Sequence, residues 1–309
     1  MRRVSVIVPC AHAGVITEQL AKALVRQKCV GFPVEVIFAI NTAESAVPAC
    51  FDGKTRVVWE RRSGAAAARN AGVRESSGDI LAFLDADCIP DPAWLAQGVK
   101  TLRRRRGAVI AGRIRRTEKP FNWVSLYDSL TYLQQEFYVR YCRACVTANI
   151  ITERDTFERI GPFDERFTEA ACEDWEWSTR ATSKGIQLLY EASAVVLHPH
   201  LRNFRQLRSK AERIGRGEAI FSRVNGKRSA GAGLFQSIAR QAQRIWRDRR
   251  TPAKNKAPLL LLAAVTAVWQ WRARMAAARS LRLADDSHTI VEAVNLKADL
   301  QNAARKPAI

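Results

Sequence analysis

The chain has 309 residues, 47% of them hydrophobic, and carries 50 lysines and arginines against 30 aspartates and glutamates. This length allows a sizeable core, as one large domain with an appendage or as two modest domains. Seven scattered cysteines indicate free thiols in a reducing compartment and argue against a disulfide framework. The net charge of +20 favours an anionic partner, whether nucleic acid, a phosphorylated substrate or a lipid surface.

Strand and helix patterns alternate along the first two hundred residues. Short apolar runs predict strands at 4–8, 34–40, 56–59, 80–84, 109–114, 146–151 and 194–197. Helical patterns occupy 16–28, 65–75, 94–104 and 122–140, and another begins at Glu173. This alternation predicts an α/β fold with a mixed, mostly parallel sheet flanked by helices.

In an open α/β sheet the ligand crevice lies beyond the carboxyl ends of the strands. Asp85-Ala86-Asp87 follows the predicted strand at 80–84. Two carboxylates at a spacing of two on extended chain would point the same way, and their oxygens suit Mg²⁺ or Mn²⁺ held together with a diphosphate. The alternative is that these aspartates only cap the following turn. Arg69, one helix upstream, would reach phosphate or sugar in the same crevice, unless it is an ordinary surface arginine.

Several motifs occur in one order over about two thirds of the chain. The first group is residues 4–9, 64–72, 78–87 and 90–95, and the second is Ala148-Asn149, Phe157, residues 161–165, Phe167, residues 173–176 and Arg180. With these motifs the sequence resembles the family-two glycosyltransferases of the GT-A fold. The resemblance implies a GT-A (Rossmann-like) domain over residues 1–200, followed by a basic helical region over 201–309.

The resemblance further implies an inverting, metal-dependent transfer of a sugar from a nucleoside-diphosphate sugar to an acceptor hydroxyl. It assigns donor binding to Pro9, Asn41, Arg69, Asp85 and Asp87, a Mg²⁺ or Mn²⁺ ion to Asp87 and His198, and the role of catalytic base to Asp174. Inversion in one displacement requires a carboxylate opposite the leaving group, to deprotonate the attacking hydroxyl.

Alternatives remain at two of these positions. Glu173 and Asp174 would also favour a helix amino terminus without any catalytic role. His200 lies two residues after His198, so either histidine is a candidate ligand, and a lone histidine is more often structural.

The sequence departs from the family pattern after the second strand. Relatives usually carry paired aspartates or Asp-Asn there, followed by Gly-Ser, whereas this chain has Asn41-Thr42-Ala43. The Asn41 amide can still bond a base or a ribose, but the ionised carboxylate is missing, so the nucleotide is not specified. A Gln-x-x-Arg-Trp element, usual in processive relatives, is absent after Asp174, which favours addition of a single sugar.

The rear region combines positive charge with apolar stretches. Between residues 201 and 256 there are sixteen lysines and arginines against three acidic residues. Five arginines recur at nearly helical spacing with apolar residues between them, at positions 202, 205, 208, 213 and 216. This pattern predicts one helix that presents its arginines to phosphates, as on an anionic membrane surface, and its apolar side chains to a core or to lipid. A second basic run, 103–106 with residues 113, 115, 116 and 119, is instead typical of a solvated helix end.

The apolar segment 258–271 has fourteen residues, fewer than the about 20 that span a bilayer. An interfacial helix, a buried helix and a span all remain open for it. Because no export signal is visible, we expect a cytoplasmic protein, peripheral on the inner face of the cell membrane. Its partners would be a nucleotide sugar, a glycan or lipid-linked acceptor and an anionic membrane, in envelope or surface glycan synthesis.

Two rival functions fit parts of the sequence. A degenerate transferase domain that binds nucleic acid or a membrane surface would explain the charge, but the basic tail carries no nucleic-acid recognition motif, so we do not expect nucleic acid as a partner. A nucleotidyltransferase would use a similar two-carboxylate metal site. Glu173-Asp174-Trp175 argues against it, because this element suits an acceptor hydroxyl.

Overall fold

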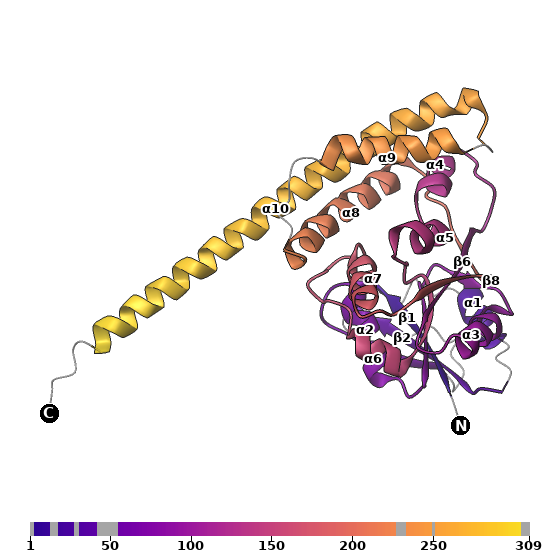
Figure 1. Ribbon diagram of the computed structural model, residues 1–309, viewed down its shortest axis with the longest axis horizontal. Coiled ribbons are helices and arrows are strands. Elements are labelled where there is room, and N and C mark those ends of the chain that lie inside the picture. Colours follow the sequence, from indigo (N-terminus) through magenta and orange to yellow (C-terminus); the bar gives the residue numbers. More distant parts are fainter. Residues whose placement is uncertain are drawn as a thin grey trace.

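The computed structural model describes residues 3–12, 18–27, 31–41, 55–226, 233–248 and 251–303 (Figure 1). Its strands are β1 (Val4–Cys10), β2 (Val34–Ile40), β3 (Thr55–Trp59), β4 (Ile80–Leu84), β5 (Ile89–Pro90), β6 (Val109–Arg116), β7 (Asn149–Glu153) and β8 (Leu188–His198). Its helices are α1 (Glu18–Val25), α2 (Ala65–Glu75), α3 (Trp94–Arg104), α4 (Trp123–Thr131), α5 (Gln135–Phe137), the π-helical turn η2 (Tyr138–Cys142), α6 (Arg154–Ile160), α7 (Glu173–Ser183), α8 (Phe204–Val224), α9 (Gly233–Arg247) and α10 (Ala253–Ala303).

The eight described strands form one mixed sheet in the order β3-β2-β1-β4-β7-β6-β8-β5. Strands β3, β2, β1 and β4 run parallel, β7 is antiparallel to β4 and to β6, and β6 is parallel to β8. The α/β class and the mostly parallel sheet flanked by helices are therefore confirmed. Because β1 and β4 end side by side, the segments that follow them share one edge of the sheet.

Apolar side chains cover both faces of the sheet, which is why β4 (Ile80–Leu84) is buried at every position. On one face, Leu20 of α1 and Trp94 of α3 belong to the same buried cluster as Val6 of β1 and Ile80 of β4. On the other face, α2, α6 and α7 pack on Phe83 of β4, with Trp177 of α7 fully buried. Two distinct cores thus hold the strand ends in place.

Two motif asparagines hold the sheet and helices together. Asn70 of α2 donates to the Phe163 carbonyl oxygen at 2.8 Å and accepts from its N–H at 2.9 Å. Asn149 of β7 is fully buried and accepts a hydrogen bond from the Trp94 indole at 2.7 Å. Asn70 and Asn149, both part of the family motifs, therefore have structural roles in this fold.

The predicted helix at 122–140 is wrong in its extent. The Asn122 side chain caps α4 through the Ser125 N–H, but α4 ends at Thr131, and Leu133 adopts a left-handed φ of 57°. The Gln135 side chain then donates hydrogen bonds to the carbonyl oxygens of Val146 and Asn149. The chain after Thr131 is thus held by contacts with a later segment and does not continue as one helix. Strand β7 also begins three residues later than predicted, and β8 begins six residues earlier.

The rear helices α8, α9 and α10 pack together beside the sheet domain, and α10 extends far beyond it (Figure 1). Two glycines of α8 allow this packing. A Cβ on Gly215 would lie 2.1 Å from the Gln270 carbonyl oxygen, and one on Gly217 would lie 2.5 Å from the Ala171 carbonyl oxygen. Helix α8 is therefore pressed against both α10 and the segment that leads into α7.

The apolar segment 258–271 forms part of α10 and is buried along one face only. Leu259, Ala263 and Thr266 are fully buried, whereas Leu261 is 67% exposed. Within the described residues, no helix has the length and apolar character that a membrane crossing requires. The domain boundary at 200/201 stays a prediction.

Candidate active site

A cavity of about 1310 Å³ lies at the carboxyl ends of β1, β2 and β4, between the sheet domain and the rear helices. Every residue to which the sequence assigned a site role lines it: Pro9, Asn41, Arg69, Asp85, Asp87, Asp174 and His198. The structure thus brings these residues together, while their individual roles remain predictions.

The segment Asp85-Ala86-Asp87 is a turn, so the expectation that both carboxylates point the same way from extended chain is wrong. The Cys88 N–H donates to the Asp85 carbonyl oxygen at 3.0 Å, which closes the turn directly after β4. As a result the two side chains have different partners. Asp85 meets Arg69 at 2.9 Å, whereas Asp87 lies 3.4 Å from His198.

Arg69 is a buried connector and not a surface arginine, since its side chain is only 3% exposed. One end of its guanidinium donates to Asp85 at 2.9 Å and the other donates to Glu173 at 2.7 Å. Glu173 is equally buried, and the Arg69 charge is what makes a carboxylate tolerable there. Arg69 therefore joins the turn after β4 to the first residue of α7.

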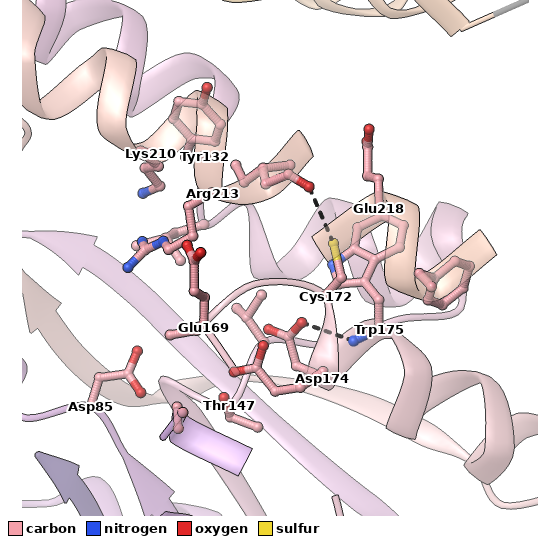
Figure 2. Close-up of a pocket in the computed structure, with 18 of the residues that line it drawn as sticks. Asp85, Tyr132, Thr147, Glu169, Cys172, Asp174, Trp175, Lys210, Arg213 and Glu218 are labelled. Carbon is pink, nitrogen blue, oxygen red and sulfur yellow. Dashed lines mark hydrogen bonds between the residues drawn. The ribbon is translucent and has the colours of Figure 1, made fainter. Parts of the chain in front are cut away.

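Asp174 stands at the amino end of α7, with Cys172 before it at a left-handed φ of 69°. Its Oδ1 atom accepts the Trp175 N–H at 2.8 Å, which fixes the carboxylate (Figure 2). Burial and the charge of Glu173 raise the pKa of Asp174 to about 8, against an opposing effect of Arg69. A carboxyl group with such a pKa is more basic than an ordinary aspartate, which suits proton abstraction.

His198, at the end of β8, faces the cavity, whereas His200 does not line it. The His198 Nδ1 atom lies 2.6 Å from the Pro199 carbonyl oxygen and 3.2 Å from Nη1 of Arg116, and we assign the ring proton to Nδ1 because the contact with the carbonyl oxygen is the shorter one. Nε2 then carries a lone pair and lies 3.4 Å from Oδ2 of Asp87. Burial lowers the pKa of His198, which favours this neutral form. Two acceptors that face each other at this distance suit a cation between them.

His200 belongs to a buried network around Asp128 of α4. The fully buried Asp128 lies 2.9 Å from Arg116 and 3.4 Å from His200 Nδ1. Arg116, predicted as part of a solvated basic run, is therefore mostly buried, with a side chain 12% exposed. Arg116 also donates to the Pro199 carbonyl oxygen at 3.0 Å, so this network supports the backbone next to His198.

Asn41 and Pro9 line the cavity at the ends of β2 and β1. The Asn41 amide donates to the Arg62 carbonyl oxygen at 2.7 Å, which leaves its own oxygen as an acceptor for a donor ligand. The neighbouring positions Thr42 and Ala43, where the sequence departs from the family pattern, lie outside the described residues.

Sequence reasoning missed the contribution of the rear helices to this cavity. Lys210 and Arg213 of α8 line it, as do Gln270 and Arg274 of α10. The signal was present, because Lys210 falls three residues after Leu207, on the buried stripe of an amphipathic helix. A charged residue in such a stripe indicates a polar cavity beneath the helix.

Comparison with known proteins agrees with the geometry. The model of the family described as Glycosyl transferase family 2 matches residues 5–161, half of the chain. Glycosyltransferase AglE of Haloferax volcanii is 29% identical over 223 residues, which cover 70% of this chain and 72% of AglE. Pre-mycofactocin glycosyltransferase of Mycobacterium tuberculosis is 32% identical over 149 residues, which cover 46% of this chain and 31% of that protein.

Solved structures share the fold. A mannosyltransferase of Pyrobaculum calidifontis, in complex with GDP-Man and Mn²⁺, aligns with a TM-score of 0.53 at 20% identity, covering 99% of this chain and 82% of that one. Glucosyl-3-phosphoglycerate synthase of Mycobacterium tuberculosis aligns with a TM-score of 0.52 at 17% identity, covering 75% and 83%. With its GT-A sheet and the family match over half of its length, the chain is a glycosyltransferase that belongs to glycosyltransferase family 2.

Proposed function

We propose that the protein transfers one sugar from a nucleoside-diphosphate sugar to an acceptor hydroxyl, with inversion at the anomeric carbon and with a divalent cation. The observation that carries this proposal is the single cavity in which Asp87 and His198 lie together with Asp174. An acid–base residue and a potential cation site are both required for such a displacement.

The donor atoms of Asp87 and His198 fit a divalent cation that is completed by substrate. Among the described residues, no cluster of three or more His, Cys, Asp and Glu side chains is grouped to hold a metal. Two protein ligands leave positions for phosphate oxygens and water, as is usual for Mg²⁺ bound with a nucleotide. When bound, Mg²⁺ or Mn²⁺ would neutralise negative charge on the departing diphosphate.

Asp174 is proposed to accept the proton of the attacking acceptor hydroxyl. The Trp175 N–H holds Oδ1 of Asp174, which leaves Oδ2 for the hydroxyl. Trp175 and Tyr138 stack edge to face, with ring centroids 5.5 Å apart, and both line the cavity. Their rings offer the apolar surface on which a sugar ring packs.

The donor class is supported by the solved mannosyltransferase, whose complex contains GDP-Man and Mn²⁺. For this chain we propose a nucleotide sugar bound by Pro9, Asn41, Arg69 and Asp85. Arg69 would act mainly by holding Asp85 in place, because both ends of its guanidinium are engaged by carboxylates.

We further propose that the acceptor is a glycan or lipid-linked glycan of the cell envelope or surface, met at the cytoplasmic face of an anionic membrane. The support is a set of apolar side chains around the small core of α4, α8, α9 and α10. Phe204 is 58% exposed, and Trp246 and Leu261 are each 67% exposed. Basic residues at 202, 205, 208, 254 and 256 neighbour them in sequence, which suits anionic lipid.

The proposal is tested by incubating the full-length protein with a panel of nucleotide sugars and Mn²⁺ and measuring release of nucleoside diphosphate. We expect release from one donor class, lost on addition of a chelator and reduced at least about hundredfold in Asp87→Ala and in Asp174→Asn. Asp155→Ala, which removes an exposed carboxylate on α6, is the matched control. Turnover by Asp174→Asn equal to that of wild type would contradict the assignment of the base.

A further inference from the structure

Two basic side chains of α8, Lys210 and Arg213, line the cavity together with Asp87 and His198. Lys210 and Arg213 enter it from α8, across the cavity from Asp85 and Asp174 (Figure 2). They lie three residues apart, so both side chains project from one face of the helix. Neither residue falls within the segment 5–161 that the family model matches.

Lys210 is held in place by a carboxylate that it shares with a second cation. Its ammonium lies 4.6 Å from the centre of the Tyr132 ring and 3.7 Å from Oδ1 of Asp128, which exceeds a hydrogen-bond length. Asp128 already has a closer partner in Arg116, at 2.9 Å. Burial lowers the pKa of Lys210 to about 8, so the ammonium remains mostly charged at neutral pH, and it shares Asp128 with Arg116.

Arg213 also has unused hydrogen-bonding capacity. Its Nε atom is buried and has no hydrogen-bond partner in the part of the chain that the structure describes. A buried guanidinium N–H without an acceptor is costly, unless a ligand supplies one. The planar guanidinium of Arg213 and the ammonium of Lys210 are both well suited to phosphate oxygens.

From these contacts we propose that Lys210 and Arg213 form a phosphate-binding pair within the cavity. The phosphate would come either from the diphosphate of the sugar donor or from a phosphate on a lipid-linked acceptor. The inference rests on the proposed function for the identity of these two sources, but the site itself is defined by the charges of α8. It makes α8 part of the substrate-binding site and not only a membrane-facing helix.

The test is calorimetric titration of the full-length protein in the presence of Mn²⁺. One arm uses UDP, GDP, CDP and dTDP, each compared with its nucleoside, and the other uses citronellyl phosphate compared with citronellol. Lys210→Met and Arg213→Gln are the test variants. Arg104→Gln changes an exposed arginine of α3 that neither lines the cavity nor belongs to the proposed membrane surface, and it is the matched control.

We expect each test variant to lose about tenfold or more in affinity for the phosphate compound, because a charge-assisted hydrogen bond is lost, while affinity for the nucleoside or alcohol is unchanged. A loss confined to the nucleotides identifies the donor diphosphate as the ligand, and a loss confined to citronellyl phosphate identifies the acceptor. Unchanged affinity for every phosphate in both variants, or no phosphate binding by wild type, overturns the inference.

Thermal melting of both variants shows whether a loss of binding comes from a disturbed fold. Lys210 neighbours the buried Asp128, so Lys210→Met can disturb the fold, whereas Arg213→Gln changes no recorded contact of Asp128. Thermal melting identifies such a case, and Arg213→Gln then decides the outcome alone. If nucleotide-sugar turnover is found and depends on Asp87, but both variants bind like wild type, the inference fails while the proposed function stands.

Discussion

Arg69 and Glu173 form an ion pair at 2.7 Å in which each side chain is only 3% exposed. The residues come from α2 and α7, which are more than one hundred positions apart in sequence. The same guanidinium reaches Asp85, so one arginine holds the turn that carries Asp85 and Asp87 against the helix that carries Asp174. The relative position of these carboxylates therefore depends on Arg69.

We expect Arg69→Met to lower the free energy of unfolding by ~3 kcal/mol, because removal of one member of a buried ion pair leaves the other uncompensated. Chemical denaturation at pH 7 measures this change. The double variant Arg69→Met/Glu173→Met should recover most of the loss, since no unpaired buried charge remains at position 173. A single variant within 1 kcal/mol of wild type, roughly the value of an exposed pair, would show that the pair adds little.

Replacing Glu173 with glutamine should change the pH profile of the reaction. Glu173 raises the pKa of Asp174, and the base is active only when deprotonated, so kcat/KM of wild type should rise with pH through about 8. Without the negative charge of Glu173, the Asp174 pKa falls, and the rising limb should move to lower pH by roughly one unit. Turnover measured from pH 5 to 10 gives the rising limb of wild type and that of the variant. A shift of the variant's limb to higher pH would refute this electrostatic account.

Asp174→Asn provides the stability control for that experiment. A group with a raised native pKa binds its proton up to about pH 8 in the folded protein, whereas the unfolded chain releases it near about pH 4. Wild-type stability should therefore fall as pH rises between these values, and this contribution should vanish in Asp174→Asn. Denaturation of wild type and of Asp174→Asn at pH 5 and pH 8 measures this contribution. If the variant is folded at both pH values, its loss of activity comes from the missing carboxylate and not from misfolding.

Membrane association should depend on the exposed apolar side chains of α9 and α10. We expect Trp246→Ser and Leu261→Ser each to weaken binding to phosphatidylglycerol vesicles about tenfold, through loss of apolar burial in the interface. Sedimentation with vesicles measures the bound fraction, and phosphatidylcholine vesicles report the charge dependence. Val25→Ser is a matched control, because Val25 of α1 is 64% exposed on a different part of the molecule. Equal binding by all three variants would exclude this surface.

The close approach of α8 to the segment before α7 should not tolerate a side chain at Gly217. A Cβ there would lie 2.5 Å from the Ala171 carbonyl oxygen, so in Gly217→Ala either α8 or the segment before α7, which both line the cavity, must shift. Overpacking of this kind costs about 1–3 kcal/mol. Thermal melting should show the loss, together with weaker nucleotide binding. Ser209→Ala, on the exposed side of α8, should match wild type in both assays.

The sequence predicted the sheet edge well because burial on both faces produces readable apolar runs. The run at 80–84 places Asp85 and Asp87 at a strand end, and the structure puts them in the cavity. The different directions of the Asp85 and Asp87 side chains were not predictable from their spacing, because they depend on the turn that the Cys88 N–H closes. Local pattern thus located the carboxylates but did not orient them.

Features that depend on distant contacts were harder to predict. The helix expected at 122–140 is interrupted because Gln135 bonds the backbone of Val146 and Asn149, which no local propensity encodes. Lys210 was overlooked because its charge resembled that of the neighbouring arginines, although its position on the buried stripe distinguished it. In both cases tertiary structure decided the outcome.

The long helix α10 carries its last turns well away from the sheet domain (Figure 1). A fluorescent protein or affinity handle attached after Ala303 would consequently be remote from the cavity, whereas removing everything after His200 would strip Lys210, Arg213 and Arg274 from the cavity wall. Engineering of this enzyme should therefore add at the carboxyl end and leave the preceding helices intact.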